Sequence, residues 1–207
     1  MITIKESILS RSSHNGESFK AQRRNEIEKW LKEYDIKNYT INDDFTIYVN
    51  GNVNLFRRDL VEFPDYIQFE IVKGNFNCGS NKLTSLRGCP REVGRIFYCD
   101  INKLTSLEGA PKEVGENFYC SYNQLTSLEG APKRVRRSFN CNYNKLTSLE
   151  GTPKEVGGYF SCNNNKLTTL EGAPKEIRGD FYCSRNSTQF TEDDVRKVSI
   201  VKEKIYC

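Results

Sequence analysis

The chain has 207 residues, of which 37% are hydrophobic and 28% are charged, and its formal net charge is +4 at pH 7. The length corresponds to one domain, and the mild charge argues neither for nor against an acidic partner. No run of about 18 apolar residues predicts a membrane span, and the first residues lack the apolar segment of a secretory signal. So low a hydrophobic fraction suits a solenoid, whose coils all lie near solvent.

The N-terminal residues predict an arm followed by a helix. Residues 1–20 are polar and serine-rich, so we expect a flexible arm with at most a short helix at residues 4–9. From about Ala21 the pattern becomes helical, because apolar residues recur three and four positions apart. The residues of this apolar stripe are Ile27, Trp30, Leu31 and Tyr34.

Residues 21–70 together are predicted to cap a repetitive core. Residues 39–55 alternate in polarity as the strands of a hairpin do, with Asn50-Gly51 as the turn signal. Residues 60–69 have the apolar spacing of an incomplete first coil. A helix and a hairpin at this place would cover the open end of the stacked coils that follow.

Residues 71–187 repeat with a period of 21 residues, following the pattern V-x-x-x-F-x-C-x-x-N-x-L-T-S-L-E-G-x-P. A fixed period in this range is typical of stacked repeats. Phe and Cys are two residues apart, so both point to one face of a short strand. The repeated asparagine follows the strand, where its amide is expected to bond backbone groups of its own and the adjacent coil. The asparagines are Asn81, Asn102, Asn123, Asn144, Asn165 and Asn186.

This pattern resembles the leucine-rich repeat, whose core is L-x-x-L-x-L-x-x-N-x-L, with Phe and Cys in the inward strand positions. The short row with L-T-S-L and a proline is most similar to the bacterial subfamily of that repeat. The resemblance covers about half of the chain. It implies an α/β, mostly β solenoid with one parallel sheet, capped at its N-terminal end by the helix and hairpin.

The C-terminal residues 188–207 predict a second, short helical cap. Thr191 and Asp194 have the spacing of a capping box at the start of a helix. An extended segment is expected after this helix, around Ile200, Val201 and Ile205.

The layout beyond the repeat resembles proteins encoded by tailed phages, particularly those of gut Bacteroidales. The segments that carry this resemblance are MITIKESILS, W-L-K-E-Y, N-Y-T-I-N-D-D-F-T-I, E-F-P-D-Y-I-Q-F and F-T-E-D-D-V-R-K-V. It implies a virus-encoded protein made in the cytoplasm of a host bacterium, and no reaction. The N-terminal arm also resembles the tags that send internal proteins into phage heads, so a place inside the virion is the alternative.

The cysteines follow the repeat rather than a metal-ligand spacing, and His14 is the only histidine. We therefore expect buried, reduced cysteines, with Cys207 incidental, and neither a metal nor another cofactor. No catalytic motif or constellation is present, so no enzyme is predicted.

Three exposed positions beside each strand vary between repeats while their neighbours do not. Tyrosines in adjacent coils, surrounded by polar residues, are typical of binding surfaces, although exposed tyrosine also simply suits a strand. We expect a non-enzymatic protein-binding module that uses its concave sheet, with a host protein as partner. The predicted contact residues are Tyr98, Asp100, Tyr119, Tyr122, Asn142, Tyr143, Asn163, Tyr182 and Arg185.

One return loop is unusually basic and gives a second alternative, nucleic-acid binding. Its residues are Lys133, Arg134, Arg136 and Arg137. This is the least favoured function, because the tyrosines and the arginines are expected on different sides of the coil.

Overall fold

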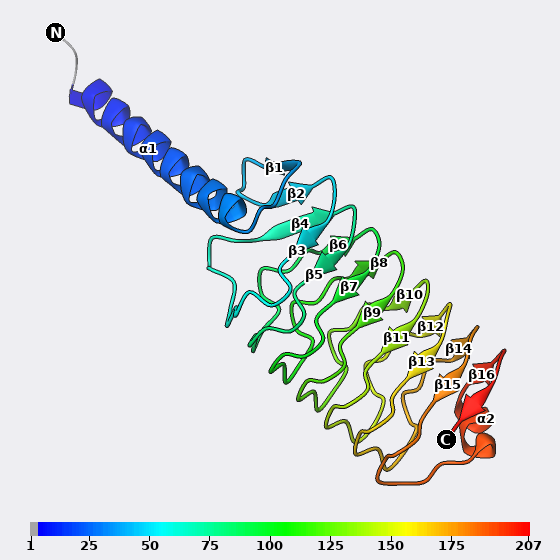
Figure 1. The fold of residues 1–207 in the computed structure, drawn as a ribbon. Coiled ribbons are helices and arrows are strands. Elements are labelled where there is room, and N and C mark those ends of the chain that lie inside the picture. Colours follow the sequence, from blue (N-terminus) through cyan, green and yellow to red (C-terminus); the bar gives the residue numbers. More distant parts are fainter. Residues whose placement is uncertain (1–3) are drawn as a thin grey trace.

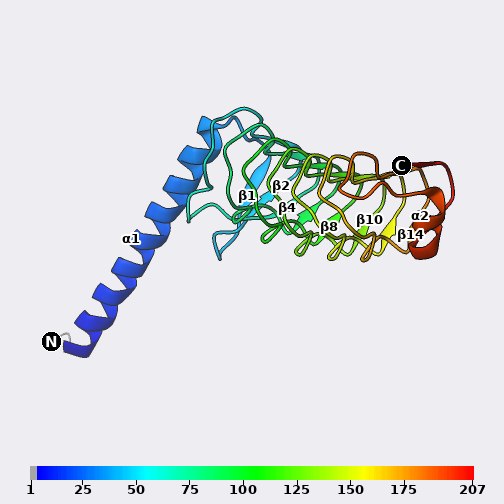
Figure 2. The same cartoon turned by 90° about the horizontal axis from the view of Figure 1, so that it is seen from below.

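The computed structural model describes the backbone of residues 4–207 and the side chains of residues 17–207. The chain begins with one long helix, α1 (Ile4–Glu33), which extends away from the body (Figure 2). The prediction that this helix starts near Ala21 was wrong, and residues 1–3 of the expected arm lie outside the described residues. The segment contains no proline and only one glycine, Gly16, at a cost of about 1 kcal/mol, so nothing in it stops a helix.

The body is a solenoid whose coils each contribute two short strands, and these form two separate sheets (Figure 1). The nine-stranded sheet contains β1 (Tyr39–Ile41), β2 (Ile47–Val49), β4 (Phe69–Val72), β6 (Glu92–Val93), β8 (Glu113–Val114), β10 (Arg134–Val135), β12 (Glu155–Val156), β14 (Glu176–Ile177) and β16 (Ile200–Val201). The eight-stranded sheet contains β3 (Val53–Asn54), β5 (Phe76–Asn77), β7 (Phe97–Tyr98), β9 (Phe118–Tyr119), β11 (Phe139–Asn140), β13 (Phe160–Ser161), β15 (Phe181–Tyr182) and β17 (Ile205–Tyr206).

The mostly β solenoid of parallel strands is confirmed, but one sheet was expected and two are present. The second sheet arises from the repeated valine, which lies four residues before the phenylalanine. Val93 and Phe97 are both buried, with 1% and 0% of their surface exposed. Three residues between them are enough to turn the chain, so each coil has a bend here with one strand on either side of it.

The capping hairpin has a different turn from the one predicted. β1 and β2 pair antiparallel, and the tight turn between them includes Phe45 at a φ of 66°. Asn50-Gly51 instead lies between β2 and β3, where the chain bends from one sheet to the other. The residues after β2 are thus already the first coil, since β2 pairs in parallel with β4 and β3 with β5.

A column of stacked phenylalanines forms the core. Successive rings from Phe76 to Phe181 lie 5.2–5.8 Å apart between centroids, and every one is fully buried. Trp30 of α1 closes the N-terminal end of this column, because its ring lies 6.2 Å from those of Phe63 and Phe69. The end of the helix thus covers aromatic surface that the first coil would otherwise leave in water.

A second column, of asparagine amides, links each coil to its neighbour. In Asn123, Oδ1 accepts the N–H of Leu104 at 3.0 Å, while Nδ2 donates to the carbonyls of Cys99, Cys120 and Ser121 at 3.0–3.3 Å. Two of these four partners belong to the preceding coil. The expected role of the asparagine is confirmed, and no buried side-chain nitrogen or oxygen among the described residues lacks a partner.

The cysteines form a third column, with one departure from expectation. Six are free and buried, and five of these donate their thiol to a carbonyl of the next coil, as Cys99 does to Tyr119 at 3.3 Å. Cys207 is not incidental, because it forms a disulfide with Cys183. The reduced state expected of all cysteines therefore fails at this pair, where β17 returns the last residue to the solenoid.

The C-terminal cap has the predicted helix, α2 (Glu192–Val198), within the last coil. The Thr191 side chain accepts the N–H of Asp194, and the Asp194 carboxylate accepts the N–H of Thr191. This reciprocal pair confirms the capping box, and the predicted extended segment is β16 and β17.

Replacing Asn123 by alanine tests the amide column. The change leaves buried backbone groups without partners, so we expect it to lower the free energy of unfolding by about 2–4 kcal/mol. The exposed neighbour Gln124, changed to alanine, serves as the matched control and should alter stability by less than about 0.5 kcal/mol. Equal losses for the two variants in urea titrations would show that the amides contribute little.

Thiol titration tests the disulfide. The unfolded protein should present six thiols without reductant and eight with it. Reductant should also lower the stability of the wild type by about 2–4 kcal/mol, but not that of a Cys207→Ser variant, which has no such bond to lose. Eight thiols in the absence of reductant would exclude the bond.

Candidate partner-binding face

The outer face of the eight-stranded sheet carries a row of tyrosines. In each coil the phenylalanine and the cysteine point into the core, so the residue between them points outward. Tyr98 and Tyr119 occupy this position in adjacent coils, and their ring centroids lie 5.3 Å apart. The in-register pairing of β7 with β9 therefore sets the distance between the two rings.

A ridge runs along the same face. It is formed by the residue that directly precedes the repeated asparagine of each coil. All six residues at this position have a φ of 53–57°, in the left-handed region: Ser80, Ile101, Tyr122, Tyr143, Asn164 and Arg185. None is a glycine, so each costs about 1–2 kcal/mol of backbone strain. Hydrogen bonds between coils hold this conformation, as in Tyr122, whose N–H donates to the carbonyl of Asn142 at 3.0 Å.

The ridge displays its side chains to solvent. Ile101, Tyr122 and Tyr143 are 53%, 52% and 40% exposed, and because they lie in successive coils they form one contiguous exposed patch. The rings of Tyr122 and Tyr143 stack at 4.2 Å with an interplanar angle of 10°. This contact orders both rings before any partner arrives.

Between β7, β9 and the ridge lies a hollow of about 600 Å³, which we call the tyrosine groove. The side chains that matter for its chemistry are Tyr98, Asp100, Ile101, Tyr119, Tyr122 and Tyr159. Most of this lining is aromatic or apolar, and Asp100 is its only charged residue.

Asp100 is held in place by the neighbouring coil. Its Oδ1 atom accepts the N–H of Ser121 at 2.9 Å and the Ser121 hydroxyl at 2.6 Å. Burial nevertheless raises the pKa of Asp100 above the ordinary value of 3.8, so desolvation outweighs the two hydrogen bonds.

Two further predicted residues make the same link in later coils. Asn142 accepts the N–H of Asn163 at 2.7 Å and the hydroxyl of Ser161 at 2.8 Å, and Asn163 accepts the N–H of Ser184 at 2.7 Å. These side chains are partly used in holding successive coils together. Asn142 is also a natural example of the neutral counterpart of Asp100 at the same position of the repeat.

Burial also acts on the tyrosines. Burial raises the pKa of Tyr119, and a hydrogen bond with the hydroxyl of Tyr159 raises it further. Burial also raises the pKa of Tyr98, and the negative charge of the nearby Asp100 adds to this rise. These hydroxyls therefore stay protonated at neutral pH and can act as hydrogen-bond donors at the edge of the groove.

The structure brings together only part of the predicted set. Tyr98, Asp100, Tyr119 and Tyr122 line the groove, and Tyr143 stacks against its rim. Tyr182 lies further along the sheet, where its ring stacks on that of Tyr206 at 4.9 Å. Arg185 is exposed on the ridge at the same end.

Sequence reasoning missed Tyr159 and Ile101 as groove residues. Tyr159 directly precedes the phenylalanine of its repeat, a position assigned to the return loop. A signal for it exists in the sequence, because this position varies between repeats just as the predicted surface positions do. The variable residues there are Ile96, Asn117, Ser138, Tyr159 and Asp180.

The basic residues lie on the other sheet, as expected. Lys133, Arg134 and Arg136 line a trough of about 990 Å³ on the nine-stranded sheet, together with Lys73 and Lys112. Arg137 is exposed near the bend between the two sheets.

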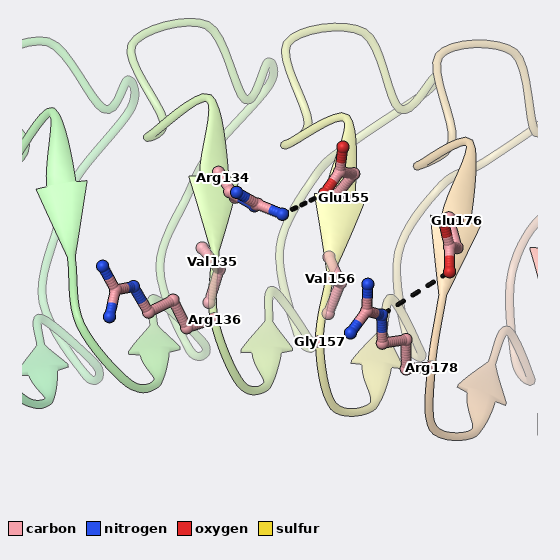
Figure 3. A pocket seen from close by; sticks show the side chains of 8 residues that line it. All are labelled: Arg134, Val135, Arg136, Glu155, Val156, Gly157, Glu176 and Arg178. Atoms are coloured by element: carbon pink, nitrogen blue, oxygen red, sulfur yellow. Dashed lines mark ion pairs between the residues drawn. The ribbon is translucent and has the colours of Figure 1, made fainter.

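Ion pairs neutralise part of the basic surface, as they do in the smaller neighbouring hollow drawn in Figure 3. There Arg134 pairs with Glu155 at 2.7 Å, and Arg178 pairs with Glu176 at 3.5 Å. Arg136 makes no ion pair within the part of the chain that the structure describes.

No protein-family model matches the chain, and neither does any curated protein or any solved structure. The fold therefore defines the class of protein, which is a repeat-based β-solenoid with a period of about 21 residues. Across residues 4–207, no helix is both long enough and apolar enough to cross a membrane.

Replacing Asp100 by asparagine tests the desolvated carboxylate. Its folded-state pKa is raised, so the charged form is disfavoured in the folded protein and lowers stability at neutral pH. The variant should be more stable than the wild type at about pH 7. Its advantage should shrink as the pH falls through the folded pKa and vanish below 3.8, the ordinary value.

Urea titrations at several pH values measure this difference. The exposed Glu129, changed to glutamine, removes a charge from the same coil as Tyr119 but outside the groove, and should give no gain that depends on pH in this way. A less stable Asp100→Asn variant at neutral pH would mean that the hydrogen bonds of the carboxylate outweigh its burial.

Proposed function

We propose that this protein is a non-enzymatic protein-binding module that contacts one macromolecular partner through the tyrosine groove and the adjoining ridge. The observation that carries the proposal is the exposed, contiguous set of aromatic rings on one sheet, in a chain that is otherwise strongly polar. Tyrosine combines a large contact area with few rotatable bonds, which favours it in binding surfaces. The stacked rings are already ordered, so binding loses little side-chain entropy.

The repeat pattern and the cap segments support a more specific assignment. The repeat supports kinship with the leucine-rich repeat, and the layout of cap and tail supports an origin in a tailed phage. Under this origin the partner is a protein of the host bacterium, met in its cytoplasm. The alternative of a packaged virion protein rests on the N-terminal arm, whose side chains up to residue 16 lie outside the described residues.

The basic trough supports a second candidate function, nucleic-acid binding. Five lysine and arginine side chains line it against two glutamates, Glu92 and Glu113. Such an excess of positive charge can contact phosphates. It ranks second because the trough lacks aromatic side chains on which bases could stack.

A double variant, Tyr119→Ala with Tyr122→Ala, tests the main proposal. Tagged wild-type protein should capture one stoichiometric protein from nuclease-treated host lysate, and the variant should lose it at least tenfold, because two anchors are removed. The melting temperature should fall by only a few degrees, since both rings lie outside the core and lose only their stacking on Tyr98 and Tyr143. Retained capture by the variant would refute the assignment of this face.

The reciprocal control is Arg134→Ala with Arg136→Ala on the other sheet. It should capture the partner as the wild type does. A salt titration against DNA and RNA examines the second candidate with the same variant. If the wild type binds DNA or RNA more tightly at low salt, and the arginine variant but not the tyrosine variant loses this affinity, then nucleic-acid binding at the trough is the function.

A further inference from the structure

The tyrosine groove has a charge pattern that runs against the chain as a whole. The protein contains 31 lysines and arginines against 27 acidic residues, yet the lining of the groove holds no basic residue and one carboxylate. The lining of the groove therefore carries a net negative charge, which comes from Asp100 alone.

Within the side chains that the structure describes, this carboxylate has no cationic partner. Among residues 17–207, no lysine or arginine nitrogen lies within 4.0 Å of the Asp100 carboxylate. Both of its side-chain hydrogen bonds go to Oδ1, from Ser121, so Oδ2 remains available to an external donor. A desolvated, unpaired charge is unfavourable, and a cation brought by a ligand would offset that cost.

The rings around Asp100 favour the same kind of ligand. Four tyrosines line the groove: Tyr98, Tyr119, Tyr122 and Tyr159. The face of an aromatic ring attracts a cation, and this attraction strengthens where water is excluded. A carboxylate beside aromatic rings thus suits a guanidinium or ammonium group better than a neutral or an acidic one.

We infer that the tyrosine groove receives a lysine or arginine side chain of the protein partner, with Asp100 as its counter-ion and the surrounding tyrosines as its walls. This inference rests on the proposed function and specifies the chemistry of the partner. The groove, at about 600 Å³, is larger than one side chain, so it also admits the backbone that carries it.

Nuclear magnetic resonance titrations test the inference directly. The probes are the N-acetyl amides of arginine and lysine, with those of citrulline and norleucine as uncharged counterparts. The two cationic probes should shift the amide signals of Tyr98, Tyr119 and Ser121, and should bind at least fivefold more tightly than their counterparts. Arginine and lysine are compared to show which of the two the groove prefers.

The decisive variant is Asp100→Asn, because the same repeat position holds Asn142, which likewise accepts a backbone N–H and a serine hydroxyl of the next coil. It should keep the fold, as amide spectra will show, and should weaken the cationic probes about tenfold or more, since a charged hydrogen bond is removed. Glu129→Gln, which removes a charge elsewhere, should leave their affinity unchanged.

Three results would overturn the inference: no response to either cationic probe, equal binding of charged and uncharged probes, or unchanged cation binding in the Asp100→Asn variant. Capture from lysate separates this failure from that of the proposed function. If Asp100→Asn retains the partner while the double tyrosine variant loses it, the face binds a protein but not through a cation. If the double tyrosine variant also retains it, the proposed function fails.

Discussion

Strands of two residues pair through few backbone hydrogen bonds, and the turn after each strand leaves carbonyl groups with no partner in the ladder. In this solenoid the asparagine amide supplies the missing bonds, because one side chain satisfies groups in two coils. The amide also donates to the carbonyls of Cys120 and Ser121, the two residues before Tyr122, while the N–H of Tyr122 donates to the carbonyl of Asn142 in the next coil. The ridge that presents Tyr122 and Tyr143 therefore lies on a turn held by a buried amide together with backbone bonds between coils.

The residues that hold the coils together are separate from those that form the outer face, so the outer face is available for binding. Backbone hydrogen bonds, the asparagine amides and the buried phenylalanine, cysteine, leucine and valine side chains hold the coils together, so side chains on the outer face can vary without weakening the fold. Polar residues beside the strand are engaged in hydrogen bonds between coils, as Asn142 is with Asn163, whereas Tyr122 and Tyr143 contact each other through ring stacking alone. The two sheets consequently carry different chemistry, aromatic on one and charged on the other.

The sequence predicted the features that repeat, because a period of 21 residues states directly which positions are alike. It predicted the inward Phe and Cys, the asparagine bonds and the capping box. Two features were not predicted, because they do not follow from the period of the repeat. The second sheet follows from the spacing of Val93 and Phe97, which has no counterpart in the repeat it resembles. The bond of Cys183 to Cys207 spans 24 residues, because α2 lengthens the last coil beyond the period.

The uniform stacking of coils also fixes the spacing between equivalent side chains on the binding face. Equivalent side chains recur every 4.8 Å or so along the solenoid axis, whereas alternate side chains of an extended segment recur at about 6.7 Å. The two spacings come back into step only after about seven coils, roughly 33 Å along the axis. A straight segment lying along the axis is therefore already out of phase with the tyrosine positions at its second outward side chain, so the length of a matching segment is limited by geometry before chemistry is considered.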